Sequence, residues 1–141
     1  MSLEAEAARG ALRFCVELSS HTVIDEEGIV PAIRGALARA VRSLASPAEA
    51  HVFLDGSLYA PKEYEQETII RGDSQVPAIM LASVAAKVTR DRLMLQYANE
   101  YPEYGFERHK GYGTALHMEA VRMHGASPIH RRTYIRGISN A

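Results

Sequence analysis

Cysteine, long apolar runs and net charge are all in short supply in this chain of 141 residues, a length that suits one domain with a modest core. The one cysteine, Cys15, excludes an internal disulfide and fits a reducing compartment, so we expect a cytoplasmic protein. No apolar run approaches the roughly 20 residues of a membrane-spanning helix, and we expect no signal peptide. The net charge of −1 does not by itself indicate a nucleic-acid-binding protein.

The charges are unevenly distributed along the chain. Residues 1–103 hold 10 Lys and Arg against 15 Asp and Glu, a net charge of −5. Residues 104–141 hold 6 Lys and Arg against 2 Asp and Glu, a net charge of +4, together with four of the six histidines. An acidic body with a basic end is consistent with metal-binding carboxylates beside a phosphate-binding surface, and it is also common by chance.

The apolar pattern predicts an α/β chain in the order strand, helix, strand, strand, helix, with a helical C-terminal end. Leu12–Leu18 alternates as a strand covered mainly on one face, whereas the continuous run 51–54 suits an inner strand covered on both faces. Another short strand is expected over 67–71. Helices are expected to start at Asp25–Gly28 and end at Leu44, to run from Pro77 to about Tyr97, and to run from Thr114 to His124.

Two aspartates occupy positions that suit chemistry. Asp55 follows the strand at 51–54, and open α/β sheets place ligands at the carboxyl ends of inner strands, although an aspartate before glycine is also common in turns. Asp91 falls on the apolar stripe of the central helix, which is formed by Met80, Val84, Val88 and Leu95. A carboxylate that faces a core is costly unless compensated. Asp91 therefore either pairs with a base such as Arg90 or Lys87 or points into a site that holds a cation.

The last third of the chain contains an aromatic loop and two basic segments. Residues 101–106 include three aromatic side chains, which we expect to pack under the loop. Residues 108–114 form a basic, glycine-containing loop with one tyrosine, and a second basic segment covers 127–134. Between them, Thr114 could cap a helix that Gly125 ends. His117 and His124 are expected on the surface of that helix.

Five short blocks of the chain carry a recognisable pattern. The most specific is 79–94, in which residues 86–91 read Ala-Lys-Val-Thr-Arg-Asp. Residues 109–114 read His-Lys-Gly-Tyr-Gly-Thr and are followed by His117, and the other three blocks are 52–56, 72–73 and 130–134. In their order and spacing these blocks resemble ribonuclease HII, and the resemblance runs from about Phe14 to Tyr134.

The resemblance implies a ribonuclease H-like fold and an endoribonuclease that uses Mg²⁺ or Mn²⁺. Such enzymes cut the RNA strand of RNA–DNA hybrids and cut at ribonucleotides embedded in duplex DNA. Of the family's four metal-binding carboxylates, Asp55 matches the third and Asp91 the fourth, whereas Asp73 is interpreted as a helix cap. Tyr112 matches the tyrosine that packs on a sugar and contacts the 2′-hydroxyl at the RNA-to-DNA junction. The other expected substrate-binding residues are basic, as phosphate contacts or as plain solvated charges: His109, Lys110, Arg131 and Arg132.

One family block does not occur in this sequence. The family opens with a strand that carries Asp-Glu-Ala-Gly-Arg-Gly, which supplies the first two carboxylates and grips the nucleic acid. The nearest imitation, Asp25-Glu26-Glu27-Gly28, continues as Ile29-Val30 and is interpreted as a helix start. We therefore expect an amino-terminally incomplete ribonuclease H-like core with a mixed sheet over 11–104, and a basic helical region over 105–141. Residues 1–10 are expected to be flexible or added in cloning.

The missing block leaves three functions open. The chain could be a ribonuclease HII whose cleavage is impaired by the loss of two carboxylates. It could be a non-catalytic module that binds RNA–DNA hybrids or duplexes through its basic end. It could also be a degenerate fragment that forms homo-oligomers, because an unpaired sheet edge recruits partners.

Overall fold

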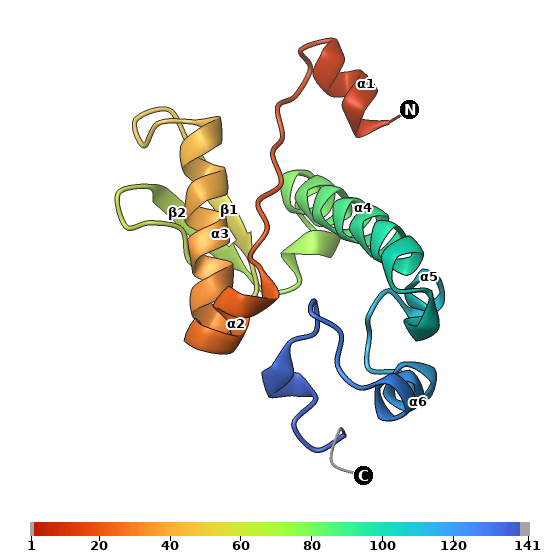
Figure 1. Ribbon diagram of the computed structural model, residues 1–141. Coiled ribbons are helices and arrows are strands. Elements are labelled where there is room, and N and C mark those ends of the chain that lie inside the picture. The colour runs from red at the N-terminus through yellow and green to blue at the C-terminus, as the bar shows by residue number, and fades with distance from the viewer. Residues whose placement is uncertain (1, 139–141) are drawn as a thin grey trace. The chain divides into compact units, whose positions relative to one another are not determined.

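A computed structural model of the chain describes residues 2–138 and forms two compact units. The first unit contains the residues up to Ser19 and Ile29–Lys87, and the second contains Ser20–Gly28 and the residues from Val88 onward. The helices and strands, labelled in part in Figure 1, follow in the order α1 (Leu3–Ala8), α2 (His21–Glu27), α3 (Ile29–Leu44), β1 (His51–Asp55), β2 (Glu65–Ile69), η1 (Gly72–Ser74), α4 (Pro77–Glu100), η2 (Pro102–Tyr104), α5 (Phe106–His109), α6 (Ala115–His124) and η3 (Arg132–Tyr134). In the described part of the chain, no helix is both long and apolar enough to cross a membrane.

The first unit is built around a parallel pair of strands and α3. His51 lies opposite Glu65, and the register continues until Asp55 lies opposite Ile69. The end of α3 is tied to the residues just before β2, because the Tyr64 hydroxyl donates to the carbonyl of Ala45 over 2.9 Å. The predicted α/β class, with the expected ribonuclease H-like character, is confirmed.

The prediction of a strand over Leu12–Leu18 is wrong. This segment runs as irregular chain and makes its polar contacts with α3 rather than with another strand. The Cys15 thiol donates to the carbonyl of Ala40, and Arg39 contacts both the carboxylate of Glu17 and the carbonyl of Leu18. Alternation of apolar residues produces a strand only where a neighbouring strand offers a hydrogen-bonding edge. Among the described residues, β1 pairs with β2 alone.

The strand β1 is less covered than its apolar run predicts. Leu54 is buried, but Phe53 on the other face is 43% exposed, so the expected burial of both faces is wrong. The strand β2 begins two residues earlier than predicted. A sheet of two strands offers too little surface for layers on both sides, so one face of β1 remains open to solvent.

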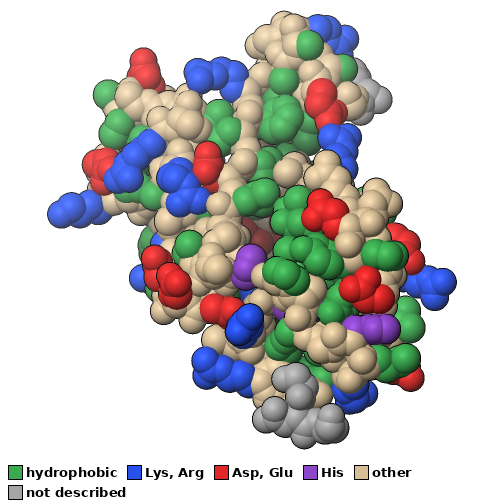
Figure 2. Space-filling view, in the orientation of Figure 1, with side chains coloured by type: hydrophobic (Ala, Val, Ile, Leu, Met, Phe, Trp, Pro, Cys, Tyr) green, Lys and Arg blue, Asp and Glu red, His purple; other side chains and the backbone are tan. Residues whose placement is uncertain are grey.

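The central helix α4 begins at Pro77, as predicted, and extends to Glu100, three residues beyond the expected end near Tyr97, but it buries different residues from those expected. The stripe of Met80, Val84, Val88 and Leu95 is 40–47% exposed, whereas the buried side chains are Ile79 and Ala85. Figure 2 shows hydrophobic side chains at the surface of the face in view. The stripe therefore has the helical spacing that was predicted, but it is not buried against a core as expected.

The second unit has its own core. It consists of Tyr104, Phe106, Ala120, Val121 and Ile135. The expected packing of the aromatic loop is thereby confirmed. Helix α6 begins and ends as predicted, because the Thr114 hydroxyl accepts the amide of His117 and Gly125 adopts a φ of 76° at the other end. His124 is exposed, but the expectation that His117 lies at the surface is wrong, since it is only 5% exposed.

Helix α3 begins at Ile29, directly after residues 25–28, as predicted, but Asp25 itself belongs to the preceding helix α2. Residues 25–27 form the last turn of α2, and Gly28, with a φ of 92°, separates that helix from α3. The carboxylate of Asp25 accepts the amide of Arg132 over 2.7 Å and the amide of Thr133 over 3.0 Å. Sequence periodicity does not reveal such a contact, because Arg132 and Thr133 lie 107 and 108 residues after Asp25 in the chain.

Candidate metal and nucleic-acid site

Asp55 stands at the end of β1, where its carboxylate is held by a backbone amide. Its Oδ1 accepts the N–H of Gly72 over 2.8 Å, across the turn that follows β2. Gly72 is buried, and a Cβ there would lie 2.6 Å from Cδ1 of Ile79 and 3.4 Å from Cβ of Ile69. Only a glycine therefore allows the amide to approach Asp55 without a shift of its neighbours.

Asp91 lies in the second unit, half-buried in the middle of α4. Its proximity to Asp55, which belongs to the first unit, stays a prediction. Both side chains are carboxylates, the ligand type that Mg²⁺ and Mn²⁺ prefer, so the donor chemistry fits the expected ion. Within residues 2–138, no group of three or more His, Cys, Asp and Glu side chains is arranged to hold a metal ion.

The basic loop after α5 turns sharply and packs against α4. Lys110 and Gly111 both adopt left-handed backbone conformations, with φ values of 51° and 74°. A Cβ on Gly111 would lie 3.0 Å from Cε of Met94, so the loop needs glycine both for its conformation and for this close approach. The ring of Tyr112 remains 56% exposed, and the guanidinium carbon of Arg90 lies 4.7 Å from its centre.

The second basic segment is fixed from two sides. The guanidinium of Arg131 stacks on the ring of Tyr134 at 4.0 Å, and Asp25 binds the backbone amides of the next two residues. The hydrogen bond from the Thr133 hydroxyl lowers the pKa of Asp25, so the carboxylate stays charged at the start of η3. The side chain of Arg132 is exposed beside these hydrogen bonds.

Three buried histidines join the two basic segments. His117, His130 and His109 are 5–7% exposed, and the rings of His109 and His117 stack 4.5 Å apart. Nε2 of His117 lies 3.0 Å from Nε2 of His130, and Nδ1 of His117 lies 3.0 Å from the carbonyl of Tyr112. Burial lowers the pKa of His117, and burial together with the neighbouring His117 lowers the pKa of His130 to about 4. At neutral pH the rings of His117 and His130 are therefore uncharged.

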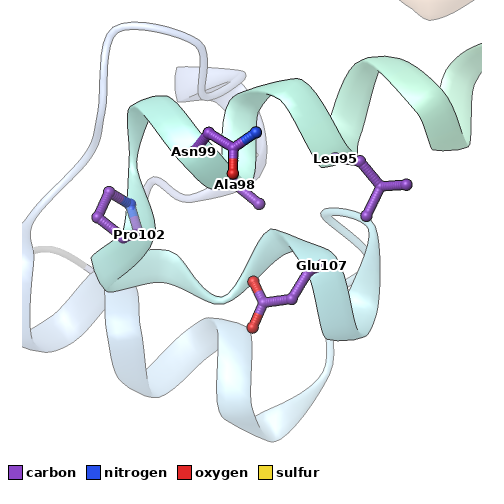
Figure 3. Close-up of a pocket in the computed structure, with 5 residues that line it drawn as sticks. All are labelled: Leu95, Ala98, Asn99, Pro102 and Glu107. Atoms are coloured by element: carbon purple, nitrogen blue, oxygen red, sulfur yellow. The ribbon is translucent and has the colours of Figure 1, made fainter.

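A shallow hollow lies between the end of α4 and α5 (Figure 3). It is lined by Leu95, Ala98, Asn99, Pro102 and Glu107, and none of these is a predicted site residue. Its mixed lining contains one carboxylate and one amide, and we assign it no role.

The structure thus brings together Tyr112 and Lys110 on one loop, with Arg90 packed against that loop. Sequence reasoning missed Arg90 as the support of the tyrosine ring, and it missed the link between His117 and His130. His130 belongs to one of the blocks that carry the family resemblance, and His117 follows another, so both could be noticed in the sequence. What the sequence did not show was that they face each other.

The parallel strand pair with its flanking helices is consistent with the ribonuclease H-like class. Within this class, the family model for ribonuclease HII matches residues 7–137. The chain therefore belongs to the ribonuclease HII family.

Curated relatives support the same assignment. The chain is 45% identical over 134 residues to a ribonuclease HII of Marinomonas sp., covering 94% of this chain and 67% of that protein. It is 46% identical to that of Geobacter sulfurreducens, covering 91% of this chain and 58% of the relative, and 44% identical to that of Endomicrobium trichonymphae, covering 88% and 59%. The chain spans between half and two thirds of the length of such relatives.

Proposed function

We propose that this chain carries out, or retains part of, the activity of a metal-dependent endoribonuclease that cuts the RNA strand of RNA–DNA hybrids and cuts at ribonucleotides embedded in duplex DNA. The observation that carries the proposal is the arrangement around α4. Asp91 follows Arg90 directly, and the exposed ring of Tyr112 lies against the Arg90 guanidinium. A candidate metal ligand and a candidate sugar-contacting ring are therefore linked through adjacent residues of one helix.

Asp55 and Asp91 are the proposed ligands of Mg²⁺ or Mn²⁺. When bound, such an ion activates water and stabilises the leaving oxygen of the cut strand. The amide of Gly72 fixes Asp55 through Oδ1, which leaves Oδ2 as the oxygen to face an ion. The contribution shown by the chain's own residues is thus to hold the carboxylate of Asp55 in a fixed orientation.

The proposed substrate surface combines Tyr112 with three bases. Lys110, Arg131 and Arg132 contact phosphates, and Tyr112 packs on a sugar whose 2′-hydroxyl distinguishes RNA from DNA. His109 is buried, and its Nδ1 accepts the amide of Gly111 over 3.2 Å. We propose that His109 supports the loop from beneath rather than touching the nucleic acid.

A second function, binding without cleavage, is favoured by the exposed basic residues of the C-terminal end, among them Arg132. Of the family's four carboxylates, this sequence matches two, Asp55 and Asp91. Two carboxylates hold Mg²⁺ loosely and do not fix two ions for an in-line displacement. We therefore expect the isolated chain to cut slowly or not at all at physiological Mg²⁺.

The cleavage assay uses a duplex with one embedded ribonucleotide, in Mg²⁺ and in Mn²⁺, with Asp91→Asn as the test variant. The exposed Asp73→Asn serves as the matched control, because it removes an equal charge in a turn of the first unit. Weak cleavage that is lost only in Asp91→Asn supports the catalytic proposal. Robust cleavage that survives Asp91→Asn would contradict the assigned role of this carboxylate.

The binding assay measures affinity for hybrid and all-DNA duplexes over a range of salt concentrations. Replacing Lys110, Arg131 and Arg132 with alanine should weaken binding to every duplex and flatten the salt dependence, because fewer counterions are released. The control replaces three exposed bases of the first unit, Arg13, Arg34 and Lys62, and so changes the net charge equally. Equal losses in both triple variants would show that the basic end has no special role.

We also propose that the chain forms a homodimer or a larger assembly. Among the described residues the sheet has only β1 and β2, so each strand has one edge without a strand partner, and the stripe on α4 is exposed. Unpaired edges and apolar surface both favour association. Light scattering that shows a stable monomer at tens of micromolar would refute this proposal.

A further inference from the structure

We propose that His117 and His130 are positioning residues, which act as a relay of uncharged imidazoles to hold the Tyr112 loop at a fixed place relative to the basic segment at Arg131. The inference rests on the proposed function of Tyr112 as the residue that senses a ribonucleotide. It assigns to two buried histidines a role in specificity rather than in metal binding or chemistry.

The backbone partners of the relay determine where each proton lies. The amide of Ser127 donates to Nδ1 of His130 over 3.0 Å, so that nitrogen is an acceptor and the ring proton sits on Nε2. Nε2 of His130 then donates to Nε2 of His117, 3.0 Å away. Since Nε2 of His117 accepts, its proton sits on Nδ1 and is donated to the carbonyl of Tyr112 over 3.0 Å. One direction of donation satisfies all the nitrogens.

The carbonyl of Tyr112 is the end point of the relay. It also accepts the amide of Thr114 over 2.7 Å, while the amide of Tyr112 donates to the carbonyl of His109 over 2.9 Å. Both backbone polar groups of Tyr112 are therefore fixed, and its ring points outward with more than half of its surface exposed. A ring that is held from behind in this way can contact a sugar without ordering the loop at the moment of binding.

An added proton would disrupt this arrangement. A proton on Nδ1 of His130 would face the Ser127 amide and would require the Ser127 hydroxyl, 2.6 Å away, to turn from donor to acceptor, and a proton on Nε2 of His117 would face the donor nitrogen of His130. The other groups around the rings are His109 from α5, Tyr104 from η2, Phe106 and the Ser127 hydroxyl. None of these neighbours is a carboxylate that could compensate a charged imidazole.

The tautomers can be observed in the intact chain without any nucleic acid. Long-range ¹H–¹⁵N NMR spectra at pH 7 should show His130 with its proton on Nε2 and His117 with its proton on Nδ1. Finding the His117 proton on Nε2, or finding either ring charged at pH 7, would overturn the relay.

The role in specificity is tested with His117→Phe and His117→Asn, and with His124→Phe as the control on the exposed side of the same helix. The asparagine amide can replace Nδ1 as a donor, whereas phenylalanine cannot. Affinities are measured in chelator for two duplexes, one with a single ribonucleotide and one of DNA alone.

His117→Phe should lower the preference for the ribonucleotide duplex by roughly fivefold, the effect of one lost hydrogen bond, with a smaller loss of affinity for the DNA duplex through Lys110 on the same loop. His117→Asn and His124→Phe should keep the preference. If the wild-type chain prefers the ribonucleotide and His117→Phe keeps that preference, the inference is wrong and the proposed function stands. If the wild-type chain shows no preference, the proposed role of Tyr112 is wrong, and the NMR result alone decides the relay.

Discussion

Replacing Gly72 with alanine should destabilise the first unit through one identifiable atom. The added Cβ would lie 2.6 Å from Cδ1 of Ile79, a separation that side chains do not tolerate, whereas its contact with Cβ of Ile69 at 3.4 Å is ordinary. Ile79 is only 7% exposed, so it has little room to change rotamer. We expect Gly72→Ala to cost about 1–2 kcal/mol, as overpacking of a buried site does.

The second variant removes the clashing atom. Ile79→Val deletes Cδ1 and should cost about 1 kcal/mol when made alone, because it leaves a small cavity. In the double variant the alanine methyl fills that space, so its stability should be close to that of Ile79→Val alone. The result is a favourable coupling of about 1–2 kcal/mol between the two positions.

Urea denaturation followed by circular dichroism measures these free energies of unfolding. Gly137→Ala is the control, because a Cβ there meets no atom within 4 Å. If Gly72→Ala is as stable as Gly137→Ala, or if Ile79→Val does not rescue it, the close approach of Gly72 to Ile79 is not the reason for the glycine.

Three further predictions concern the stability of the folded chain. The pKa of His130 is lowered to about 4, so as the pH falls the unfolded chain takes up a proton before the folded chain does. The free energy of unfolding should therefore be highest above pH 6.5 and fall by about 3 kcal/mol toward pH 4. Urea titrations at each pH should show a weaker pH dependence for His130→Gln. Asp25→Ala should lower the melting temperature at pH 7 but much less in acid, because the Thr133 hydroxyl lowers the pKa of Asp25 and this stabilisation is lost as the carboxylate is protonated. Gly111→Ala should lower the melting temperature in calorimetry more than Gly56→Ala does, since both glycines have positive φ but only Gly111 has side chains close to the added Cβ. Equal losses would contradict the packing described for the loop.

The sequence predicted the elements whose signals are local. Pro77 begins α4, and Thr114 and Gly125 cap α6, because capping depends on residues within one turn of the helix end. The aromatic residues of 101–106 were correctly expected inside, since three large apolar groups in one loop gain more from burial than from exposure.

The errors concern contacts between distant segments. Leu12–Leu18 alternates like a strand but has no strand beside it, and the stripe on α4 has the right period but remains exposed. Asp25 has the composition of a helix start, but its carboxylate binds backbone amides near the other end of the chain. In the candidate site, Tyr112 was identified from its motif, but its support by His117 required the fold, because burial of a histidine cannot be read from a helical wheel.

The contact of Asp25 with the segment at Arg132 also sets an order of events during synthesis. The two partners are 107 residues apart, and the second unit combines Ser20–Gly28 with the residues from Val88 onward. At the usual rates of 5–20 residues per second, α2 leaves the ribosome about 5–20 s before the segment that it binds. During that interval α2 is without its partner, whereas the sequence that forms α3, β1 and β2 is completed before the interval ends. The first unit can therefore fold while the second still waits for its last residues.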